Sequence, residues 1–385
     1  MSKSRRGYQF AAQNLQESLI SGFLENDVNL TVLSIPALST FPQGCKLPFI
    51  KSTDFILHER KLGRCLGYLN IPFLNHADKQ KAVQYISEWY DANSGPRCIF
   101  VYALLEQQMS IAIAVKRRHP DIVLCIIVPD LPRFMGCNKY YKMLGKQEKS
   151  INLIYERIKC FDSLVVLAEP MVEDLGMTST PYIVVEGIWE SSEEQLIVEK
   201  DKHKVILYTG NIAPRYGITK LMSAFEKIED KDYRLWIRGT GDNSEVLKWA
   251  ERDKRIKYIG PLSKPELLKL QRKSTLLVNP VPPSQEFTRY FFPSKTMDYL
   301  ASGTPTLMFA LECLPEDYLG HIYLFSGETE EQMCNDLIHY CSKPAEELRR
   351  FGSDAVRFIR SEKNPKVQTA KIIDLITKVF YNDKH

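Results

Sequence analysis

The chain has 385 residues, of which 44% are hydrophobic and 25% charged, with a formal net charge of +4. This length exceeds one ordinary core and suits two domains of roughly 190 residues each, and the composition excludes a disordered chain. No run of about 18 apolar residues occurs, and the basic N-terminus "MSKSRRGYQF" has no apolar segment behind it, so neither a membrane span nor a secretory signal is expected.

Short apolar, β-branched runs alternate with helical patterns, which predicts an α/β fold with parallel sheets covered on both faces. The first element is a helix at 8–24. Further elements of the first half are helices at 79–92 and 106–118, and strands at 28–35, 64–71, 97–104, 121–128, 163–168 and 182–187. A doubly wound domain normally begins with a strand, so either the first domain is built differently or the chain is a shortened version of a longer one.

A second series of elements follows the charged segment "WESSEEQLIVEKDKHK" (189–204), which is the predicted domain boundary. Its strands are expected at 204–210, 233–239, 256–260, 274–280 and 304–310, with helices at 217–229, 244–252, 264–272 and 294–302. We therefore expect two Rossmann-like domains, residues 1–190 and 191–363, with ligands beyond the carboxyl ends of the strands. A last amphipathic helix is expected within residues 364–385.

Positive charge is concentrated in the first part of the chain, where residues 1–150 contain 19 Lys and Arg against 12 Asp and Glu. Two interpretations stay open: an ordinary solvated surface, or contact with an anionic partner such as a membrane surface or a pyrophosphate-linked lipid. Nucleic acid is not expected as a partner, because no basic helix and no RNP-like aromatic strand accompanies the charge.

Nine cysteines are scattered along the chain, without a CxxC pair or a zinc-type Cys/His spacing. They are interpreted as reduced thiols of a cytoplasmic protein, most of them filling cores. The seven histidines show no ligand spacing, and "EDKD" at 229–232 resembles a solvated turn more than a metal-binding DxD motif. We therefore predict neither a metal site nor a cofactor.

Three strand-end loops of the second domain contain glycines that would let a ligand approach the backbone closely. Gly210 ends a strand, and Arg215 follows it before the next helix. Gly239 and Gly241 form a tight turn in "IRGTGD", and the backbone at Leu262 could read the edge of a base. Ordinary turn and capping chemistry explains each of these loops equally well.

The fourth loop has the most distinctive sequence, "EFTRYFFPSKTMDYLASGTPTL". Pro293 and Ser294 are good helix-start residues, and the Gly-Thr-Pro that follows stops the helix. The spacing directs one set of side chains to the sheet: Met297, Leu300 and Ala301. It directs a second set, at i, i+3 and i+7, to the other side: Lys295, Asp298 and Ser302.

Lys295 and the free amides of this helix start could hold a diphosphate, while Asp298 could accept both hydroxyls of a ribose diol. The alternative is a surface Lys–Asp pair worth roughly 0.3–0.5 kcal/mol. We favour binding, because the preceding loop is too aromatic for an ordinary solvent loop, with Phe287, Tyr290, Phe291 and Phe292.

Together these segments resemble the retaining glycosyltransferases of the GT-B fold, in the bacterial group 1 class (family four) that uses nucleotide sugars. The family's Gly-loop-Gly-Leu-Ala-Phe pattern is met by Gly210, Gly217, Leu221, Ala224 and Phe225. Its Pro-Ser-Lys, acid-Tyr and Ala-Ser-Gly helix is met by Pro293, Ser294, Lys295, Asp298, Tyr299, Ala301, Ser302 and Gly303. The resemblance covers the second domain well and the first in outline.

The resemblance implies two Rossmann-like domains that face each other across a cleft, with a nucleotide sugar, most often UDP-linked, held by the second domain and the acceptor by the first. It implies transfer with retention, without a bound metal, and a last helix (364–385) that crosses back onto the first domain. Catalytic roles would fall to Asp130, Arg215 and Lys295. Donor-binding residues would be Gly7, Gly210, Asn211, Lys220, Gly239, Gly241, Leu262, Glu286, Pro293, Ser294 and Asp298. From the residues alone, Asp130 is equally well explained as a turn former after a proline.

Several positions depart from the family pattern. Asn211 and Tyr216 stand where many members have Arg and Lys. Tyr290 stands eight positions before Asp298, where the family has its first acid, and Glu286 can serve the sugar only if the aromatic loop folds back. The acid that this chain keeps, Asp298, is an aspartate where the family has a glutamate. These departures bear on donor identity and rate more than on fold.

The leading hypothesis is a cytoplasmic transferase, peripheral at the inner membrane face through its basic first domain, that builds an exopolysaccharide, capsule or O-antigen-like glycan. Its partners would be a nucleotide sugar and a glycan or lipid-linked acceptor. One alternative is a non-catalytic partner of a transferase, which the departures favour. A UDP-sugar epimerase is a third hypothesis, but it would need clustered acids and a histidine that the sequence does not show.

Overall fold

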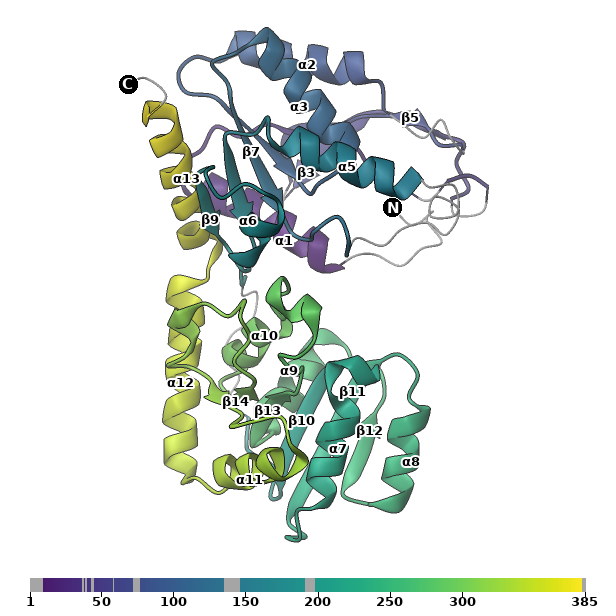
Figure 1. Ribbon diagram of the computed structural model, residues 1–385, viewed down its shortest axis with the longest axis vertical. Coiled ribbons are helices and arrows are strands. Elements are labelled where there is room, and N and C mark those ends of the chain that lie inside the picture. The colour runs from purple at the N-terminus through teal and green to yellow at the C-terminus, as the bar shows by residue number, and fades with distance from the viewer. Residues whose placement is uncertain are drawn as a thin grey trace. The chain divides into compact units, whose positions relative to one another are not determined.

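The computed structural model describes residues 10–36, 38, 40–42, 45–57, 59–71, 77–134, 146–190 and 198–382 (Figure 1). The chain forms two compact units, and the first combines Met1–Ile188 with Pro365–His385. The second unit is Trp189–Asn364. No helix of the described residues combines the length and the apolar character needed to cross a bilayer.

The second unit is built on one six-stranded parallel sheet with the order β12-β11-β10-β13-β14-β15. Its strands are β10 (Lys204–Asn211), β11 (Tyr233–Thr240), β12 (Ile256–Ile259), β13 (Leu276–Asn279), β14 (Thr306–Met308) and β15 (Tyr323–Leu324). The apolar residues 205–208 and 276–278 are buried, as parallel strands covered on both faces require. The predicted parallel α/β sheet of this unit is therefore confirmed.

The helices of this unit are α7 (Ile218–Glu226), α8 (Ser244–Arg252), α9 (Lys264–Lys273), α10 (Lys295–Ser302), α11 (Glu330–Cys341) and α12 (Ala345–Glu362). Helices α9 and α10 cover one face of the sheet, where Tyr299 packs with Leu207 and Leu277 in a fully buried cluster. Helix α12 packs on α10, and α11 packs on α7.

The first strand of this unit, β10, lies in the middle of the sheet, between β11 and β13. The chain therefore runs outward to β12 and then returns to the other side of β10 to form β13. In open parallel sheets this reversal leaves a crevice beyond the carboxyl ends of the two central strands. Here those ends are Gly210–Asn211 and Asn279.

The first unit contains a four-stranded parallel sheet with the order β6-β7-β8-β9. Its strands are β6 (Cys98–Tyr102), β7 (Val123–Val128), β8 (Ser163–Val166) and β9 (Tyr182–Val184). Its helices are α1 (Phe10–Glu25), α2 (Lys79–Ala92), α3 (Glu106–Arg118), α5 (Lys146–Ile158), α6 (Pro170–Asp174) and α13 (Pro365–Asn382). Helix α13 packs on α1 and on β7, β8 and β9, and its Ile372 is fully buried with Leu19 and Phe23.

The prediction of one strand at 64–71 is wrong. These residues belong to an antiparallel ribbon in which β3 (Thr53–Leu57) pairs with β4 (Arg60–Cys65), and β2 (Phe49–Ile50) pairs with β5 (Tyr68–Leu69). A bend at Gly67 separates β4 from β5, and a Cβ there would lie 2.3 Å from the Ile50 carbonyl oxygen. Strand β4 also pairs in parallel with β1 (Val32–Ser34). The first strand that the sequence seemed to lack would precede α1, in residues outside the described part of the chain.

Gly352 provides a test of how α12 fixes α10. Glycine in a helix is normally about 1 kcal/mol less favourable than alanine. A Cβ on Gly352, however, would lie 1.9 Å from the carbonyl oxygen of Gly303, which ends α10. We expect Gly352→Ala to lower the free energy of unfolding by about 1–3 kcal/mol, because overpacking outweighs helix propensity.

Urea denaturation of the purified chain measures this change. Gly320→Ala is the matched control, because a Cβ there meets no atom within 4 Å. A Gly352→Ala variant more stable than the wild type would show that α10 and α12 do not pack this closely.

Candidate functional site

The ammonium of Lys295 lies over the carboxyl end of β10. Its Nζ is 4.1 Å from the centroid of the Tyr208 ring, and a Cβ on Gly210 would lie 3.1 Å from it. Burial lowers the pKa of Lys295 to about 7, and no carboxylate in the described part of the chain opposes this shift. A buried cation without a counter-charge is costly unless an anion joins it, so this position is suited to an anionic ligand.

Glycines bring the ends of β10 and β11 close together beside Lys295. Gly210 and Gly239 are register partners, and a Cβ on Gly239 would lie 2.3 Å from the Gly210 carbonyl oxygen. Gly241 has a φ of 125°, which disfavours other residues, and its missing Cβ would face the Asn211 side chain at 3.6 Å. The structure thus places four predicted donor-binding residues, Gly210, Asn211, Gly239 and Gly241, at one strand-end edge.

Asn211 is itself engaged in the turn that follows β10. Its Oδ1 accepts a hydrogen bond from the Ala213 amide at 2.9 Å, and its carbonyl oxygen accepts one from the Tyr208 hydroxyl at 2.5 Å. Arg215 follows on an exposed 3-10 turn and donates to the Tyr216 hydroxyl at 3.2 Å. Lys220 is exposed on α7 and makes no hydrogen bond or ion pair with the other predicted site residues that the structure describes.

Helix α10 begins at Lys295, with Pro293 buried and Ser294 exposed just before it. Tyr299 ties this helix to β10, because its hydroxyl accepts a hydrogen bond from the Thr209 amide at 2.7 Å and donates to the Thr209 carbonyl oxygen at 3.1 Å. Burial of Met297, Leu300 and Ala301 is as predicted from their spacing.

The prediction for Ser302 is wrong, because this side chain is buried and does not lie on the open side of the helix. Its hydroxyl donates to the Tyr299 carbonyl oxygen at 2.6 Å and accepts from the Thr304 amide at 3.2 Å. Ser302 therefore closes the last turn of α10. At an i+7 position this close to a helix end, the capping hydrogen bonds determine the direction of the side chain more than the helical period does.

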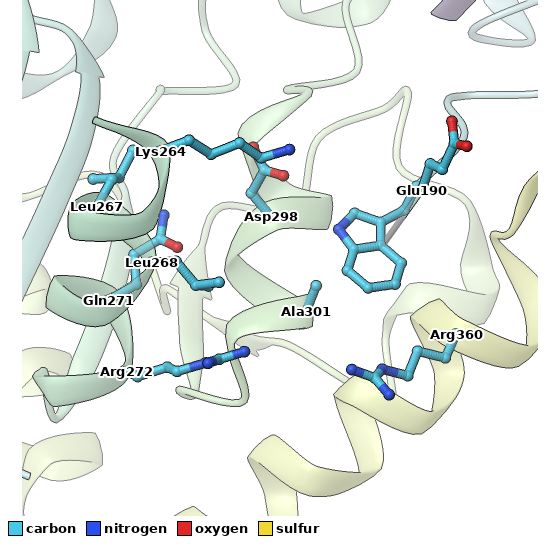
Figure 2. Close-up of a pocket in the computed structure, with 10 residues that line it drawn as sticks. Glu190, Lys264, Leu267, Leu268, Gln271, Arg272, Asp298, Ala301 and Arg360 are labelled. Carbon is cyan, nitrogen blue, oxygen red and sulfur yellow. The ribbon is translucent and has the colours of Figure 1, made fainter. Parts of the chain in front are cut away.

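Asp298 points into a pocket of about 570 Å³, part of it open to solvent (Figure 2). The pocket lies between α9, α10 and α12, and Lys264 reaches toward the Asp298 carboxylate at one end of it. Desolvation by the surrounding protein raises the pKa of Asp298, although the residue reaches solvent. The positive charge of Lys264 acts in the opposite direction and lowers this pKa. The residues that line the pocket are Trp189, Glu190, Lys264, Leu267, Leu268, Gln271, Arg272, Asp298, Ala301 and Arg360.

Leu262, the predicted base-reading position, is half-buried immediately before α9. The next residue, Ser263, forms a capping box with Glu266, whose carboxylate accepts from the Ser263 amide at 2.8 Å and from its hydroxyl at 2.6 Å. Capping thus explains the composition of this loop, and the role of Leu262 stays a prediction.

The aromatic loop between β13 and α10 is held by its buried members. Tyr290 and Phe292 are buried, and Arg289 forms a two-bond ion pair with Glu312 at 2.8 and 2.9 Å. Glu286 lies exposed at the start of the 3-10 turn Glu286–Arg289. Its predicted role toward a sugar remains a prediction.

In the first unit, Asp130 lies just after β7, and partial desolvation by the surrounding protein raises its pKa although the residue reaches solvent. Tyr102 ends the neighbouring strand β6, and burial, with the Asp130 charge, raises the pKa of this tyrosine. The next residue, Ala103, has a φ of 65°, a conformation that costs energy for any residue with a Cβ. Gly7, which was predicted to lie near the diphosphate, is outside the described residues.

Sequence reasoning missed several polar groups at these strand ends. Tyr102 was hidden inside an apolar run predicted to continue to residue 104, and Lys264 resembled an ordinary helix-start residue. Asn279, at the end of β13, is buried with neither side-chain oxygen nor nitrogen hydrogen-bonded within the described structure. Its position at the end of a predicted strand was the available signal. No group of three or more His, Cys, Asp or Glu side chains suited to a metal ion occurs among the described residues.

The pKa of Lys295 predicts a measurable dependence of stability on pH. Because its folded-state pKa of about 7 lies below the unfolded value, the unfolded chain binds more protons between about pH 7 and 10, and stability rises with pH there. Relative to Lys295→Met, the wild type should therefore gain on the order of 2 kcal/mol between about pH 6.5 and 9.5.

Denaturant unfolding of both proteins at the two pH values measures this gain. Lys220→Met, at an exposed lysine of the same unit, is the control and should show no such gain. If the wild type and Lys295→Met differ equally at both pH values, Lys295 does not carry a buried charge.

Residues 203–342 match the family model described as glycosyl transferases group 1. No curated protein sequence shows significant similarity to the chain. Among solved structures, sucrose-phosphate synthase from Thermosynechococcus elongatus is similar at 14% identity and a TM-score of 0.61, over 98% of this chain and 94% of that one.

Two further solved structures show the same fold. A trehalose-phosphate synthase (UDP-forming) from Burkholderia vietnamiensis has 8% identity and a TM-score of 0.57, over 98% of both chains. HepE of Anabaena, in complex with UDP-glucose, has 10% identity and a TM-score of 0.51, over 78% of this chain and 80% of that one. The chain therefore has the GT-B fold with two Rossmann-like domains, and its second unit contains the segment that matches the glycosyl transferases group 1.

Proposed function

We propose that the chain is a glycosyltransferase that moves a sugar from a nucleotide sugar to a glycan or lipid-linked acceptor. The second unit would hold the donor and the first unit the acceptor. The observation that carries this proposal is the buried Lys295 ammonium at the reversal of the sheet order, beside the glycine edge of β10 and β11. The match of residues 203–342 to a glycosyltransferase family supports it.

In this mechanism the protein stabilises the diphosphate that leaves when the sugar is transferred. Lys295, partly desolvated, would interact more strongly with developing negative charge than a lysine in water would. Arg215, on the turn that follows β10, would supply a second positive charge. Asp298 would accept the two ribose hydroxyls from its pocket. Asp130 would face the sugar from the first unit.

The finer features of the proposal come from the family resemblance. We propose that the donor is a UDP-sugar, that configuration is retained, and that no metal ion or cofactor takes part. Two neighbours of known structure, a UDP-forming trehalose-phosphate synthase and HepE in complex with UDP-glucose, support UDP. Glycan building of the exopolysaccharide, capsule or O-antigen type is the biological role proposed.

We also propose peripheral contact with an anionic membrane, and the antiparallel ribbon of the first unit is the element suited to it. Phe49, Ile56 and Leu69 expose 54, 62 and 42% of their surface there. The same ribbon carries Lys51, Arg60, Lys61 and Arg64 against Asp54 and Glu59, and Lys61 is the register partner of Ile56. Apolar insertion combined with cationic attraction is the usual basis of binding to anionic lipid surfaces.

A non-catalytic partner subunit remains the second candidate, because Asn211 and Tyr216 stand where many family members have Arg and Lys. An active transferase and a non-catalytic partner subunit would both be expected to bind UDP, so catalytic turnover of a UDP-sugar distinguishes them. Release of free sugar or UDP from a UDP-sugar supports the enzyme, whereas binding without turnover supports the partner. A UDP-sugar epimerase is a weaker alternative, and conversion of one UDP-sugar into its epimer would reveal it.

Calorimetric titration with UDP and 2′-deoxy-UDP tests the donor site. Lys295→Ala should raise the Kd for both nucleotides at least about tenfold, because a charged hydrogen-bond donor is lost. The wild type should prefer UDP over its deoxy analogue by roughly fivefold, and Asp298→Asn should abolish that preference.

Lys254→Ala, at an exposed lysine just before β12, is the comparison for charge alone and should leave UDP affinity unchanged. Unaltered UDP affinity in Lys295→Ala would remove the basis of the proposal, and a preference for UDP that survives in Asp298→Asn would remove the ribose role.

Sedimentation with vesicles tests the membrane contact. The chain should bind phosphatidylglycerol vesicles and not phosphatidylcholine vesicles, and Ile56→Ser should weaken binding several-fold. Leu319→Ser, at an apolar residue of the second unit that is 48% exposed, should leave binding unchanged. Equal binding by all three proteins would contradict a role for the ribbon.

A further inference from the structure

Three aromatic side chains from two strand-end loops of the second unit meet edge to face. The ring centroid of Tyr216, from the turn after β10, lies 5.9 Å from that of Phe287, with an interplanar angle of 69°. Phe287 lies 6.2 Å from Phe291, with an angle of 61°. The two loops follow β10 and β13, the strands between which the sheet order reverses.

This cluster does not serve as a hydrophobic core. Phe291 exposes 40% of its surface, and Phe287 and Tyr216 are half-buried, whereas the flanking Tyr290 and Phe292 are buried. Phe291 contributes less to folding than the two buried aromatics beside it, because 40% of its surface remains in water. Some other requirement therefore places its ring here.

The backbone beneath the cluster is fixed. The carbonyl oxygen of Phe291 accepts a hydrogen bond from the buried Cys313 thiol, with sulfur and oxygen 3.2 Å apart. The Thr288 hydroxyl donates to the Gln285 carbonyl oxygen at 2.6 Å, and Arg289 is held by Glu312. The rings are thus presented by a pre-organised loop, which lowers the entropic cost of binding a ligand on them.

The cluster continues from the proposed diphosphate site. Lys295 lies over the ring of Tyr208, and the Tyr208 hydroxyl donates a hydrogen bond to the Asn211 carbonyl oxygen at the start of the turn that carries Tyr216. The Arg215 guanidinium is 5.0 Å from the centroid of the Tyr216 ring. One side of the cluster therefore meets the groups proposed to bind phosphate, and its other side is open at Phe291.

We propose that Tyr216, Phe287 and Phe291 form an aromatic platform on which the pyranose ring of the donor sugar stacks. The C–H groups of a pyranose face carry partial positive charge, which the negative face of an aromatic ring attracts. The sugar follows directly on the diphosphate, and the platform lies in the same unit as Lys295. Two of its three rings, Phe287 and Phe291, lie in the loop in which Tyr290 replaces an acid of the family, so contact with C–H groups would replace binding of sugar hydroxyls by a carboxylate.

This inference rests on the proposed function, because it deepens the description of the same donor site. Saturation-transfer NMR on the full chain tests it, with UDP-glucose, UDP-galactose and UDP-N-acetylglucosamine as probes and UDP as the reference. Irradiation of the protein's aromatic protons should transfer saturation to the sugar ring protons of at least one probe. The uridine protons of that probe report nucleotide binding in the same experiment.

We expect Phe291→Ala and Phe291→Leu to reduce the sugar signals at least threefold relative to the uridine signals, since neither side chain has a ring. Phe291→Tyr keeps the ring and should retain them. Leu247→Ala is the matched control, at a 44% exposed apolar residue on α8. The thermal midpoint of each variant shows that it is folded.

The outcomes separate the two proposals. Uridine signals that persist while the sugar signals are equal in the wild type and Phe291→Ala overturn the platform and leave the nucleotide site standing. Sugar signals lost equally in Phe291→Ala and Leu247→Ala also overturn it. Absence of uridine and UDP signals in the wild type overturns the proposed function and the platform with it.

Discussion

The charge of Lys295 at the end of β10 is the constraint on which the site depends. Its ammonium lies against the face of Tyr208, a contact that compensates a partly desolvated cation only in part. Gly210 and Gly239 let the strand ends approach closely beside it, because a Cβ would lie 3.1 Å from the Lys295 Nζ at Gly210 and 2.3 Å from the Gly210 carbonyl oxygen at Gly239. A partly desolvated positive charge of this kind is stabilised when an anion binds beside it. The organisation of the second unit follows from this requirement.

The position of that charge is determined by how α10 is held. The Tyr299 hydroxyl bonds to the backbone of Thr209, which couples the helix to the strand whose end lies under Lys295. At the other end of the helix, Gly303 and Gly352 bring α10 and α12 into backbone contact. The same helix therefore carries Lys295 toward the strand end and Asp298 toward the pocket with Lys264.

Strands β10 to β14 and helices α7 to α10 could be predicted from sequence, because the strands are continuous apolar runs between helices with clear start and stop signals, whereas β15, α11 and α12 were not predicted. The ribbon at 49–69 could not, because its strands mix Asp54, Arg60, Lys61 and Arg64 with apolar residues and pair antiparallel. In the site, strand-end position identified Lys295 and Asp298 as candidates. Burial of Ser302 depends on two capping bonds, and the interactions of Tyr102 with Asp130 and of Lys264 with Asp298 depend on neighbours distant in sequence, so no local pattern revealed them.

Helix α13 has a consequence for the order in which the chain can fold. Its Ile372 completes the apolar cluster around Leu19 and Phe23, and Asn26 of the first unit bonds to the Lys366 carbonyl oxygen and to Thr369. All of Trp189–Asn364 lies between these partners in the chain. During synthesis the second unit can therefore assemble while the first still lacks part of its core. The first unit, most of which is synthesised first, therefore completes its hydrophobic core only after the second unit has been synthesised.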